Sequence, residues 1–399
     1  MKPRRKPSGK PVRPTVRGRM NDSCEIRPFI VMEVLEKALA LERAGRSIIH
    51  LEVGEPDFPT PPRIVRSATD ALAKGQTHYT DSRGISELRA AVARHHTRKY
   101  GTNVSEGRVL VTMGTSPALL LVLSLLIKEP GDEIIISNPG YPCYPNFIRF
   151  LRGVPRCIPV REQEGFQLKP DAVRQAIGPR TRAVIVNSPS NPAGTLIPKD
   201  DFAEICSLGI PVISDEIYHG LVYGEKEHSA LEFTDEAFIL NGFSKLYAMT
   251  GWRLGYLIAP AKHMRRLQIL QQNLFICANS FVQRGGVAAL SEEHPEIEEM
   301  KQRYDARRRY LCEALPRLGL PFAVEPKGAF YFFVNASHID PDSYRLAFDI
   351  LDSAGVGVTP GIDFGEHGEG YLRISYANSL ENIVEGMRRL AGYLERRMK

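Results

Sequence analysis

Short apolar runs of four to six residues recur along the chain and end in polar, glycine or proline turns. Runs of this length that are rich in valine, isoleucine and aromatic residues are typical of buried strands rather than helices. They predict strands at 48–53, 109–112, 133–137, 183–186, 210–214, 237–240, 254–258, 330–334 and 371–376.

Three longer segments have the pattern of helices. Apolar residues recur at helical spacing over 29–43, which predicts an amphipathic helix. The run 118–127 is interrupted by Ser124 and is far shorter than the ~20 residues that span a bilayer, so it predicts a buried helix. A charged helix at about 297–315 is expected to bridge two domains. Its three consecutive arginines at 307–309 should spread around the helix rather than form a nucleic-acid patch.

The length of 399 residues exceeds the usual size of one compact core, so two domains are expected. The formal charge of +6 is concentrated at the start, where residues 1–20 hold eight bases and no acid. Removing these eight charges leaves −2, which disfavours nucleic-acid binding by the rest of the chain. We interpret residues 1–20 as a disordered basic tail. The alternative is an arm that touches nucleic acid or a membrane. Met20 is an alternative first residue of the natural protein.

Neither secretion nor metal binding is indicated. The start lacks a charged segment followed by an apolar segment, so no secretory signal is expected. Six scattered cysteines form no C-x-x-C pair, which argues against a zinc site and a disulfide framework. The expected location is the reducing cytoplasm.

The most informative stretch is 242–255, which places Lys245 and Arg253 eight residues apart between two predicted strands. A lysine at the end of a buried strand is partly desolvated, so its amine can act as a nucleophile and form a Schiff base. Arg253 could clamp an anion, most usefully a phosphate. A lone lysine is more often a solvated loop residue, so this pattern needs support from elsewhere.

These fourteen residues resemble the lysine signature of the class I/II pyridoxal 5'-phosphate (PLP)-dependent aminotransferases, of fold type I and aspartate/aromatic aminotransferase-like. The resemblance implies that Lys245 carries PLP. In that family a serine often stands three residues before the lysine and touches the phosphate, whereas this chain has Gly242. Ser244 is the candidate replacement for that contact.

Two further segments match the family's cofactor site. The predicted strand 109–112 leads through Gly114, Thr115 and Ser116 into the apolar helix, with Ser116 as expected N-cap and Pro117 at the first helical position. A helix N-terminus offers free N–H groups to a phosphate, although any capped helix would show these residues. Tyr141 follows the next strand, and the resemblance implies that it stacks on the pyridine ring. Its alternative is a core or turn aromatic.

Three polar residues lie at the ends of the following strands. Asn191, in the loop 187–194, matches the family asparagine that hydrogen-bonds the phenolic oxygen of PLP. Asp215 ends a buried strand and must be paired there. In the family its partner is the protonated pyridine nitrogen, and the alternative is a helix N-cap. Tyr218 resembles the tyrosine that shares the phenolic oxygen with Asn191.

The resemblance also implies substrate contacts and a partner. Gly54, in Val-Gly-Glu-Pro-Asp-Phe, matches the glycine whose backbone approaches the substrate carboxylate, where a side chain would occupy the substrate's place. Asn191 lies beside this site, and Arg373 matches the arginine that holds the α-carboxylate through two parallel bonds. Tyr79 matches a tyrosine that reaches the partner's phosphate, which implies a homodimer with shared sites.

Together, these matches imply a mostly parallel sheet flanked by helices in a large PLP-binding domain (60–295), with a smaller α+β domain from both chain ends (21–59 and 296–399). The implied reaction moves an amino group between an L-amino acid and a 2-oxo acid through PLP and pyridoxamine phosphate. Lys245, Asp215 and Tyr218 are the implied catalytic residues, with Lys245 as proton shuttle. The nearest alternative is a PLP-dependent lyase that carries out β-elimination. A PLP-binding regulator would need a DNA-binding domain, which twenty disordered residues cannot supply.

The side chain of the substrate is expected to be apolar or aromatic. The apolar loop 275–281 and the residues Ile30 and Val31 favour this interpretation. No second arginine for a side-chain carboxylate is recognisable in the sequence.

Overall fold

The computed structural model describes residues 26–397. The predicted basic tail, the alternative start at Met20 and Cys24 lie outside these residues.

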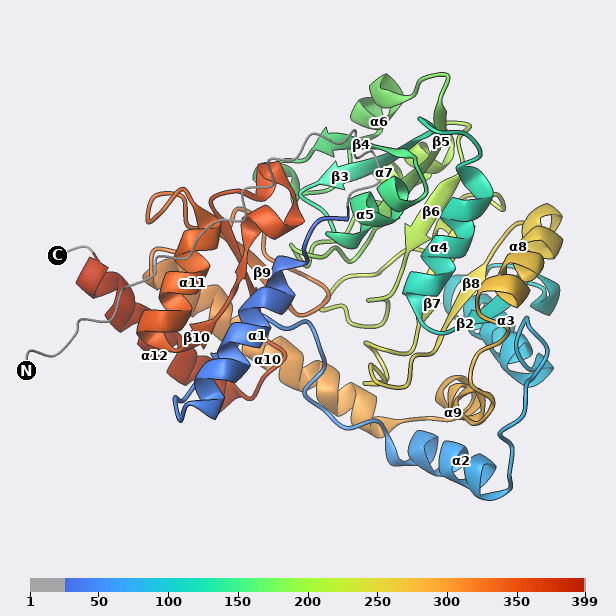
Figure 1. Cartoon of the computed structure of the whole chain (residues 1–399), viewed down its shortest axis with the longest axis horizontal. Helices are drawn as coiled ribbons and strands as arrows, with labels where there is room; N and C mark the ends of the chain where they lie inside the picture. The colour runs from blue at the N-terminus through green and yellow to red at the C-terminus, as the bar shows by residue number, and fades with distance from the viewer. Residues whose placement is uncertain (1–25, 398–399) are drawn as a thin grey trace, which may run out of the picture.

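A seven-stranded sheet forms the centre of the larger part of the molecule (Figure 1). Its strand order is β2-β8-β7-β6-β5-β3-β4, and all neighbours are parallel except β8, which is antiparallel to both β2 and β7. The predicted mostly parallel sheet is therefore confirmed. The strands are β2 (Val109–Thr112), β3 (Glu133–Asn138), β4 (Val154–Pro159), β5 (Thr181–Asn187), β6 (Val212–Asp215), β7 (Phe238–Gly242) and β8 (Gly255–Ile258).

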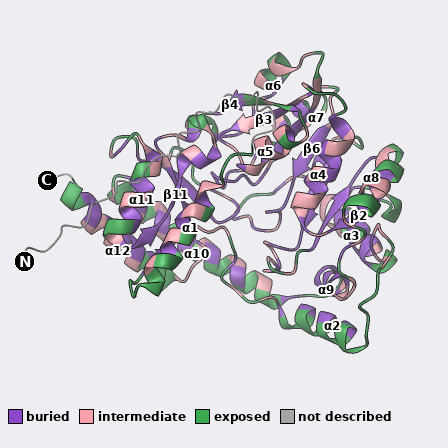
Figure 2. Ribbon diagram, in the orientation of Figure 1, coloured by how far each residue is buried: buried purple, intermediate pink, exposed green. Residues whose placement is uncertain are grey.

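Helices cover both faces of this sheet, and the strands are accordingly buried (Figure 2). In β3, Ile134 and Ile136 pack in one apolar cluster and Ile135 in the other, because successive side chains of a strand point to opposite faces. One face is covered by α4 (Thr115–Leu126), α5 (Cys143–Phe150) and α8 (Ala261–Leu274). The other is covered by α2 (Pro62–Ala73), α3 (Ser86–Tyr100), α6 (Pro170–Ala176), α7 (Lys199–Cys206) and α9 (Ser280–Ser291).

Segments from both ends of the chain build a second region with its own core. In Figure 1 the blue helix α1 lies beside the orange-red helix α11. The strands are β1 (Ile49–His50), parallel to β10 (Val356–Gly357), and an antiparallel sheet in the order β11 (Thr359–Pro360), β12 (Tyr371–Ser375), β9 (Tyr331–Asn335). The helices are α1 (Ile30–Arg43), α10 (Pro295–Arg317), α11 (Ser343–Ala354) and α12 (Leu380–Arg397).

The sequence-based bounds differ from the structure in three places. The predicted strand 48–53 is only two residues long, since the chain leaves β10 after His50. No strand was predicted at Thr359 and Pro360, which form β11 and pair with Arg373 and Leu372. The edge strand β4 was not predicted, because two prolines and an arginine interrupt its apolar pattern.

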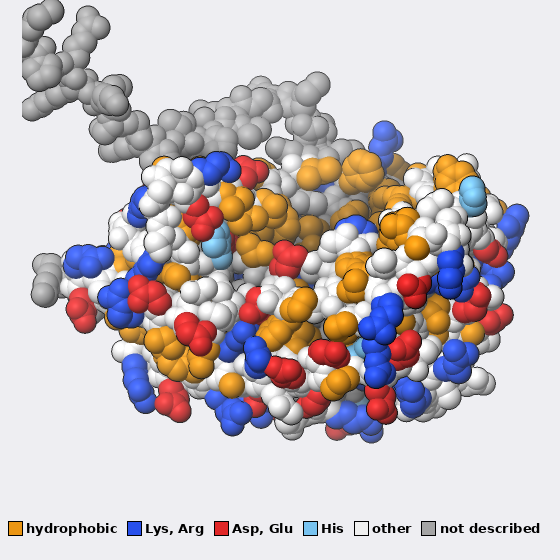
Figure 3. All heavy atoms as spheres, turned by 90° about the horizontal axis from the view of Figure 1, so that it is seen from below, with side chains coloured by type: hydrophobic (Ala, Val, Ile, Leu, Met, Phe, Trp, Pro, Cys, Tyr) orange, Lys and Arg blue, Asp and Glu red, His pale blue; other side chains and the backbone are white. Residues whose placement is uncertain are grey.

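The long helix α10 carries no basic patch. Arg307 is buried and binds Asp57 through two hydrogen bonds of 2.8 Å, and Arg308 is buried beside Asp305. Acidic and basic side chains are interspersed on the face seen in Figure 3. Within residues 26–397, no helix has the length and apolar character needed to cross a membrane.

Candidate active site

A cleft of about 320 Å³ lies between the carboxyl ends of the parallel strands and the region built from both chain ends. The larger sheet contributes loops and side chains that follow β5, β6 and β7, which is where open α/β sheets place ligands. Eleven of the thirteen predicted site residues line this cleft: Gly54, Thr115, Ser116, Tyr141, Asn191, Asp215, Tyr218, Ser244, Lys245, Arg253 and Arg373.

The start of α4 and Arg253 form a cup that suits a phosphate. Gly114 is the N-cap with a left-handed φ of 92°, and a Cβ built on it would lie 2.8 Å from Nη2 of Arg253. Because Gly114 has no side chain, the guanidinium of Arg253 can lie directly against the N-terminal end of α4. The prediction that Ser116 caps this helix is wrong, since the helix begins at Thr115 and Ser116 lies in its first turn. Both residues still line the cleft.

Gly242 and Ser244 occupy the segment that leaves β7. A Cβ on Gly242 would lie 3.0 Å from Cα of Gly255 and from the carbonyl oxygen of Leu254, so the backbone packs closely here. Ser244 lies two residues later and lines the cleft. A serine near this position therefore lines the same cleft as Thr115, Ser116 and Arg253, although position 242 is a glycine.

Lys245 extends into the cleft from the segment after β7. Its Nζ donates a hydrogen bond of 2.6 Å to the carbonyl oxygen of Gly54, and the ring of Tyr218 lies 5.9 Å away. Burial lowers the pKa of the Lys245 amine to about 8; Glu55 opposes this shift, whereas Arg373 adds to it. Near neutral pH a larger fraction of this amine is unprotonated than for an ordinary lysine, as a nucleophile requires.

Asp215 ends β6 with its carboxylate in the cleft. Oδ2 accepts a hydrogen bond of 2.7 Å from the hydroxyl of Tyr144, and Oδ1 accepts a longer one of 3.3 Å from the N–H of Ile217. Burial raises the pKa of this carboxyl group, because desolvation disfavours the charged form. A cationic partner in the cleft would offset that cost. Tyr144 was missed from the sequence, although it lies only three residues after Tyr141, in the first turn of α5.

Arg373, in β12, is held by three acceptors. Its guanidinium donates to Oδ1 of Asn191 (3.0 Å), to the carbonyl oxygen of Glu52 (2.5 Å) and to Oγ1 of Thr359 (3.2 Å). Its Nε is buried and has no hydrogen-bond partner among the described residues. Nη1 donates to Asn191 alone among these acceptors, so its second N–H is left for a carboxylate bound in the cleft.

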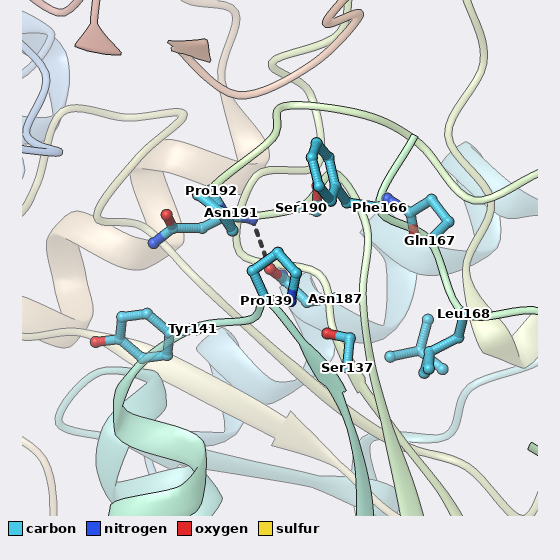
Figure 4. Close-up of a pocket in the computed structure, with 11 residues that line it drawn as sticks. Ser137, Pro139, Tyr141, Phe166, Gln167, Leu168, Asn187, Ser190, Asn191 and Pro192 are labelled. Atoms are coloured by element: carbon cyan, nitrogen blue, oxygen red, sulfur yellow. Dashed lines mark hydrogen bonds between the residues drawn. The ribbon is translucent and has the colours of Figure 1, made fainter. Parts of the chain in front are cut away.

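Asn191 is fixed on the other side by its backbone N–H, which donates to Oδ1 of Asn187 at 2.9 Å (Figure 4). Figure 4 also shows Tyr141 and Asn191 on neighbouring loops. Because Oδ1 of Asn191 is engaged by Arg373, its amide NH2 group remains to donate into the cleft.

Gly54 is constrained by a side chain that the sequence analysis did not identify. From the sequence, we explained this glycine by the space that the substrate needs. In the structure, a Cβ on Gly54 would overlap the hydroxyl of Tyr331. Tyr331 also lines the cleft, with its hydroxyl 2.7 Å from that of Tyr218.

Two groups of predicted residues lie outside the cleft. Tyr79 is 80% exposed and does not line it. The loop 275–281 and Ile30 do not line it either, whereas Val31 does, together with Phe29 and Met32. Among the described residues, the apolar lining comes from the start of α1 and from Val53 and Ile217, and the loop 275–281 is not part of it.

The family model described as aminotransferase class I and II matches residues 46–390. The chain belongs to this family. It is 43% identical over 373 residues to a (5-formylfuran-3-yl)methyl phosphate transaminase of Methanocaldococcus jannaschii, covering 92% of this chain and 97% of that protein. It also resembles solved structures of the aspartate aminotransferase of Thermus thermophilus with maleate (TM-score 0.89, 37% identity, covering 94% and 99% of the two chains) and the aromatic aminotransferase of Pyrococcus horikoshii (TM-score 0.85, 36% identity, 91% and 99%).

These findings give the protein's class of activity. It is a fold type I aminotransferase, and its family uses PLP. The phosphate cup, the amine of Lys245 and the carboxylate of Asp215 fit that cofactor, because they offer groups suited to an anion, an aldehyde and a cationic ring nitrogen around one cleft. The relatives are named as transaminases and aminotransferases, so the lyase alternative is not favoured.

Proposed function

We propose that this aminotransferase transfers the amino group of an L-amino acid with an apolar or aromatic side chain to a 2-oxo acid. The observation that carries the substrate class is the wall formed by Phe29, Val31 and Met32 at the mouth of the cleft. Among the described lining residues, the cations are Lys245, Arg253 and Arg373. Each of these has a proposed partner, so none remains for a side-chain carboxylate.

We assign the cofactor contacts as follows. Gly114, Thr115, Ser116, Ser244 and Arg253 hold the phosphate, and Tyr141 packs against the ring. Asn191 and Tyr218 donate to the phenolic oxygen, while Asp215 pairs with the ring nitrogen. PLP supplies an electron sink that stabilises the charge left when a bond to the substrate's Cα breaks.

The chain's own groups then determine which bond breaks. Arg373 holds the α-carboxylate through its guanidinium, which lines the cleft, and this contact fixes the orientation of the Cα–H bond. Lys245 would hold the cofactor through its amine, and the freed Nζ would take the proton from Cα as general base and give it to C4' of PLP as general acid. The lowered pKa of Lys245 suits both roles, because the free base is the form that reacts.

The substrate class is tested by mixing the holoenzyme with each common amino acid, without an acceptor, and following the visible absorbance of the bound cofactor. We expect faster conversion with phenylalanine, leucine or alanine than with aspartate, since the apolar wall gives a buried carboxylate no partner. Ammonia, which a lyase releases together with pyruvate, should not accumulate. A markedly higher kcat/KM for aspartate would contradict the proposed substrate class, and acceptor-independent ammonia release would indicate a lyase.

Arg373→Ala should weaken the binding of α-carboxylates by about 2–5 kcal/mol, as expected when one member of a buried charge pair is removed. The measurement is the affinity for a non-reacting carboxylate such as 3-phenylpropanoate. Phenethylamine, which has no carboxylate, serves as the matched ligand and should be affected little. If both ligands respond equally to the substitution, Arg373 has only a structural role.

We also propose a homodimer with shared sites. The segment around Tyr79 is joined to the segment 271–283, because Gln283 bonds Thr80 at 3.1 Å and Ser280 bonds the carbonyl of Gln76 at 2.7 Å. Three large side chains on these two segments are exposed: Tyr79 (80%), Leu274 (51%) and Ile276 (48%). Such neighbouring apolar side chains suit a partner surface, and a second copy would place Tyr79 beside the other chain's phosphate.

Two further assignments complete the proposal. We place the domain boundaries at 60–295 for the large domain and at 21–59 and 296–399 for the small one, supported by two apolar clusters, one drawn mostly from each set of residues. A cytoplasmic location is supported by the five cysteines within the described residues, which are all free thiols.

A further inference from the structure

Tyr331 lies between the groups assigned to the cofactor and those assigned to the substrate. It begins β9 and is 1% exposed, and its hydroxyl lies 2.7 Å from the hydroxyl of Tyr218. The centre of its ring is 4.4 Å from the guanidinium carbon of Arg373. A single side chain therefore contacts both the phenol-binding tyrosine and the carboxylate-binding arginine.

The backbone leaves Tyr331 little freedom to move. Tyr331 pairs with Ser375 of β12, the neighbouring strand that also carries Arg373. On its other side, the absence of a Cβ at Gly54 makes room for the hydroxyl. The same Gly54 accepts the hydrogen bond from Lys245. Tyr331 is thus packed among three of the groups assigned to the active site.

The direction of the bond between the two hydroxyls follows from their donor counts. A tyrosine hydroxyl has one hydrogen, so Tyr218 cannot donate both to Tyr331 and to an acceptor in the cleft. When Tyr218 donates into the cleft, Tyr331 must be the donor to the oxygen of Tyr218. A hydroxyl that accepts one bond becomes a stronger donor in the next, because the bonds polarise each other.

We propose that Tyr331 is a positioning residue that orients the Tyr218 hydroxyl into the cleft and strengthens it as a donor, while its ring supports the guanidinium of Arg373. This inference rests on the proposed roles of Tyr218 and Arg373. The sequence analysis assigned no role to Tyr331, and a phenylalanine at this position would keep the ring contact but lose the hydroxyl. The two functions of the side chain can therefore be separated by substitution.

The test is a pH titration of the bound cofactor's visible absorbance in wild-type and Tyr331→Phe holoenzyme. A hydrogen bond donated to the phenolic oxygen favours the more negative, deprotonated form of the bound cofactor. Weakening this bond should therefore raise the pH at the midpoint of the titration. We expect a rise of about half a unit for Tyr331→Phe and a larger rise for Tyr218→Phe. The charged and titratable groups facing the two hydroxyls remain in place in both variants: Arg373, Lys245, Asp215, Tyr141 and Tyr144.

A double substitution distinguishes an action through Tyr218 from a general disturbance. In the Tyr218→Phe background, Tyr331→Phe should cause no further shift. Tyr223→Phe is the matched control, because Tyr223 is also buried and its hydroxyl donates to the carbonyl of Ala329, two residues before Tyr331. It should leave the midpoint unchanged. Tyr331→Leu, which removes the ring, should in addition weaken binding of 3-phenylpropanoate, whereas Tyr331→Phe should not.

An unchanged midpoint in Tyr331→Phe, or a second shift of similar size in the double variant, would overturn the inference. So would an equal shift in Tyr223→Phe. Failure of the proposed function would give a different result. If Tyr218→Phe left the midpoint of the absorbance titration unchanged, the role assigned to Tyr218 would be wrong, and the role proposed for Tyr331 would be wrong with it. Thermal unfolding of each variant verifies that the protein measured is folded.

Discussion

Replacement of Lys245 by alanine will abolish steady-state transamination, with a loss of at least about a thousandfold in kcat. The substitution removes the only amine assigned to holding the cofactor and to moving the proton at Cα. The phosphate cup and Asp215 remain intact, so PLP should still bind without a covalent bond. Two measurements test this: the rate of oxo-acid formation, and retention of PLP after borohydride reduction and denaturation, which requires a bond to the chain.

Two variants control for the loss of a positive charge. Lys245→Arg restores the charge without a nucleophilic amine and should be as inactive as the alanine variant. Lys327→Ala removes a lysine that pairs with Glu225 and does not line the cleft, and should retain near wild-type activity. Normal turnover by Lys245→Ala would remove the basis for assigning this cleft as the catalytic site.

The strands that carry the site were predictable because both faces of the sheet are covered. β5, β6 and β7 are therefore almost continuous apolar runs; β5 and β6 end at Asn187 and Asp215 in the cleft, and β7 leads to Ser244 and Lys245 there. β4 lies at the edge, where most side chains are exposed and no apolar pattern is required, so its sequence gave no comparable signal.

The side chains that support the site were not predictable in the same way. Tyr144 and Tyr331 have ordinary sequence contexts, and their importance comes from contacts with residues 71 and 113 positions away. Phe29 and Met32 likewise enter the cleft only because α1 packs beside strands from the other end of the chain. Motif spacing identifies groups along the chain, but it does not identify the tertiary neighbours that orient them.

Tyr79 provides the sharpest test of how two copies of the chain are arranged. Tyr79 lies outside its own cleft, so in the proposed homodimer it would serve the partner's site, while Lys245 would serve its own. Tyr79→Asp would place a carboxylate beside the partner's phosphate, and like charges at close range repel. We therefore expect the Tyr79→Asp homodimer to bind PLP poorly and to be nearly inactive, as the Lys245→Ala homodimer should be.

Unfolding the two inactive variants and refolding them together in equal amounts should restore about a quarter of wild-type activity. Random pairing makes half of the dimers mixed, and in each mixed dimer both lesions fall in one site while the other site is intact. Val384→Asp, which changes a 42%-exposed valine on α12, is the matched control for the new surface charge and should be active by itself. If mixed dimers form, as mass spectrometry would reveal, but are no more active than the separate variants, Tyr79 does not reach the partner's site. Recovery of activity requires that each cleft be completed by the neighbouring chain.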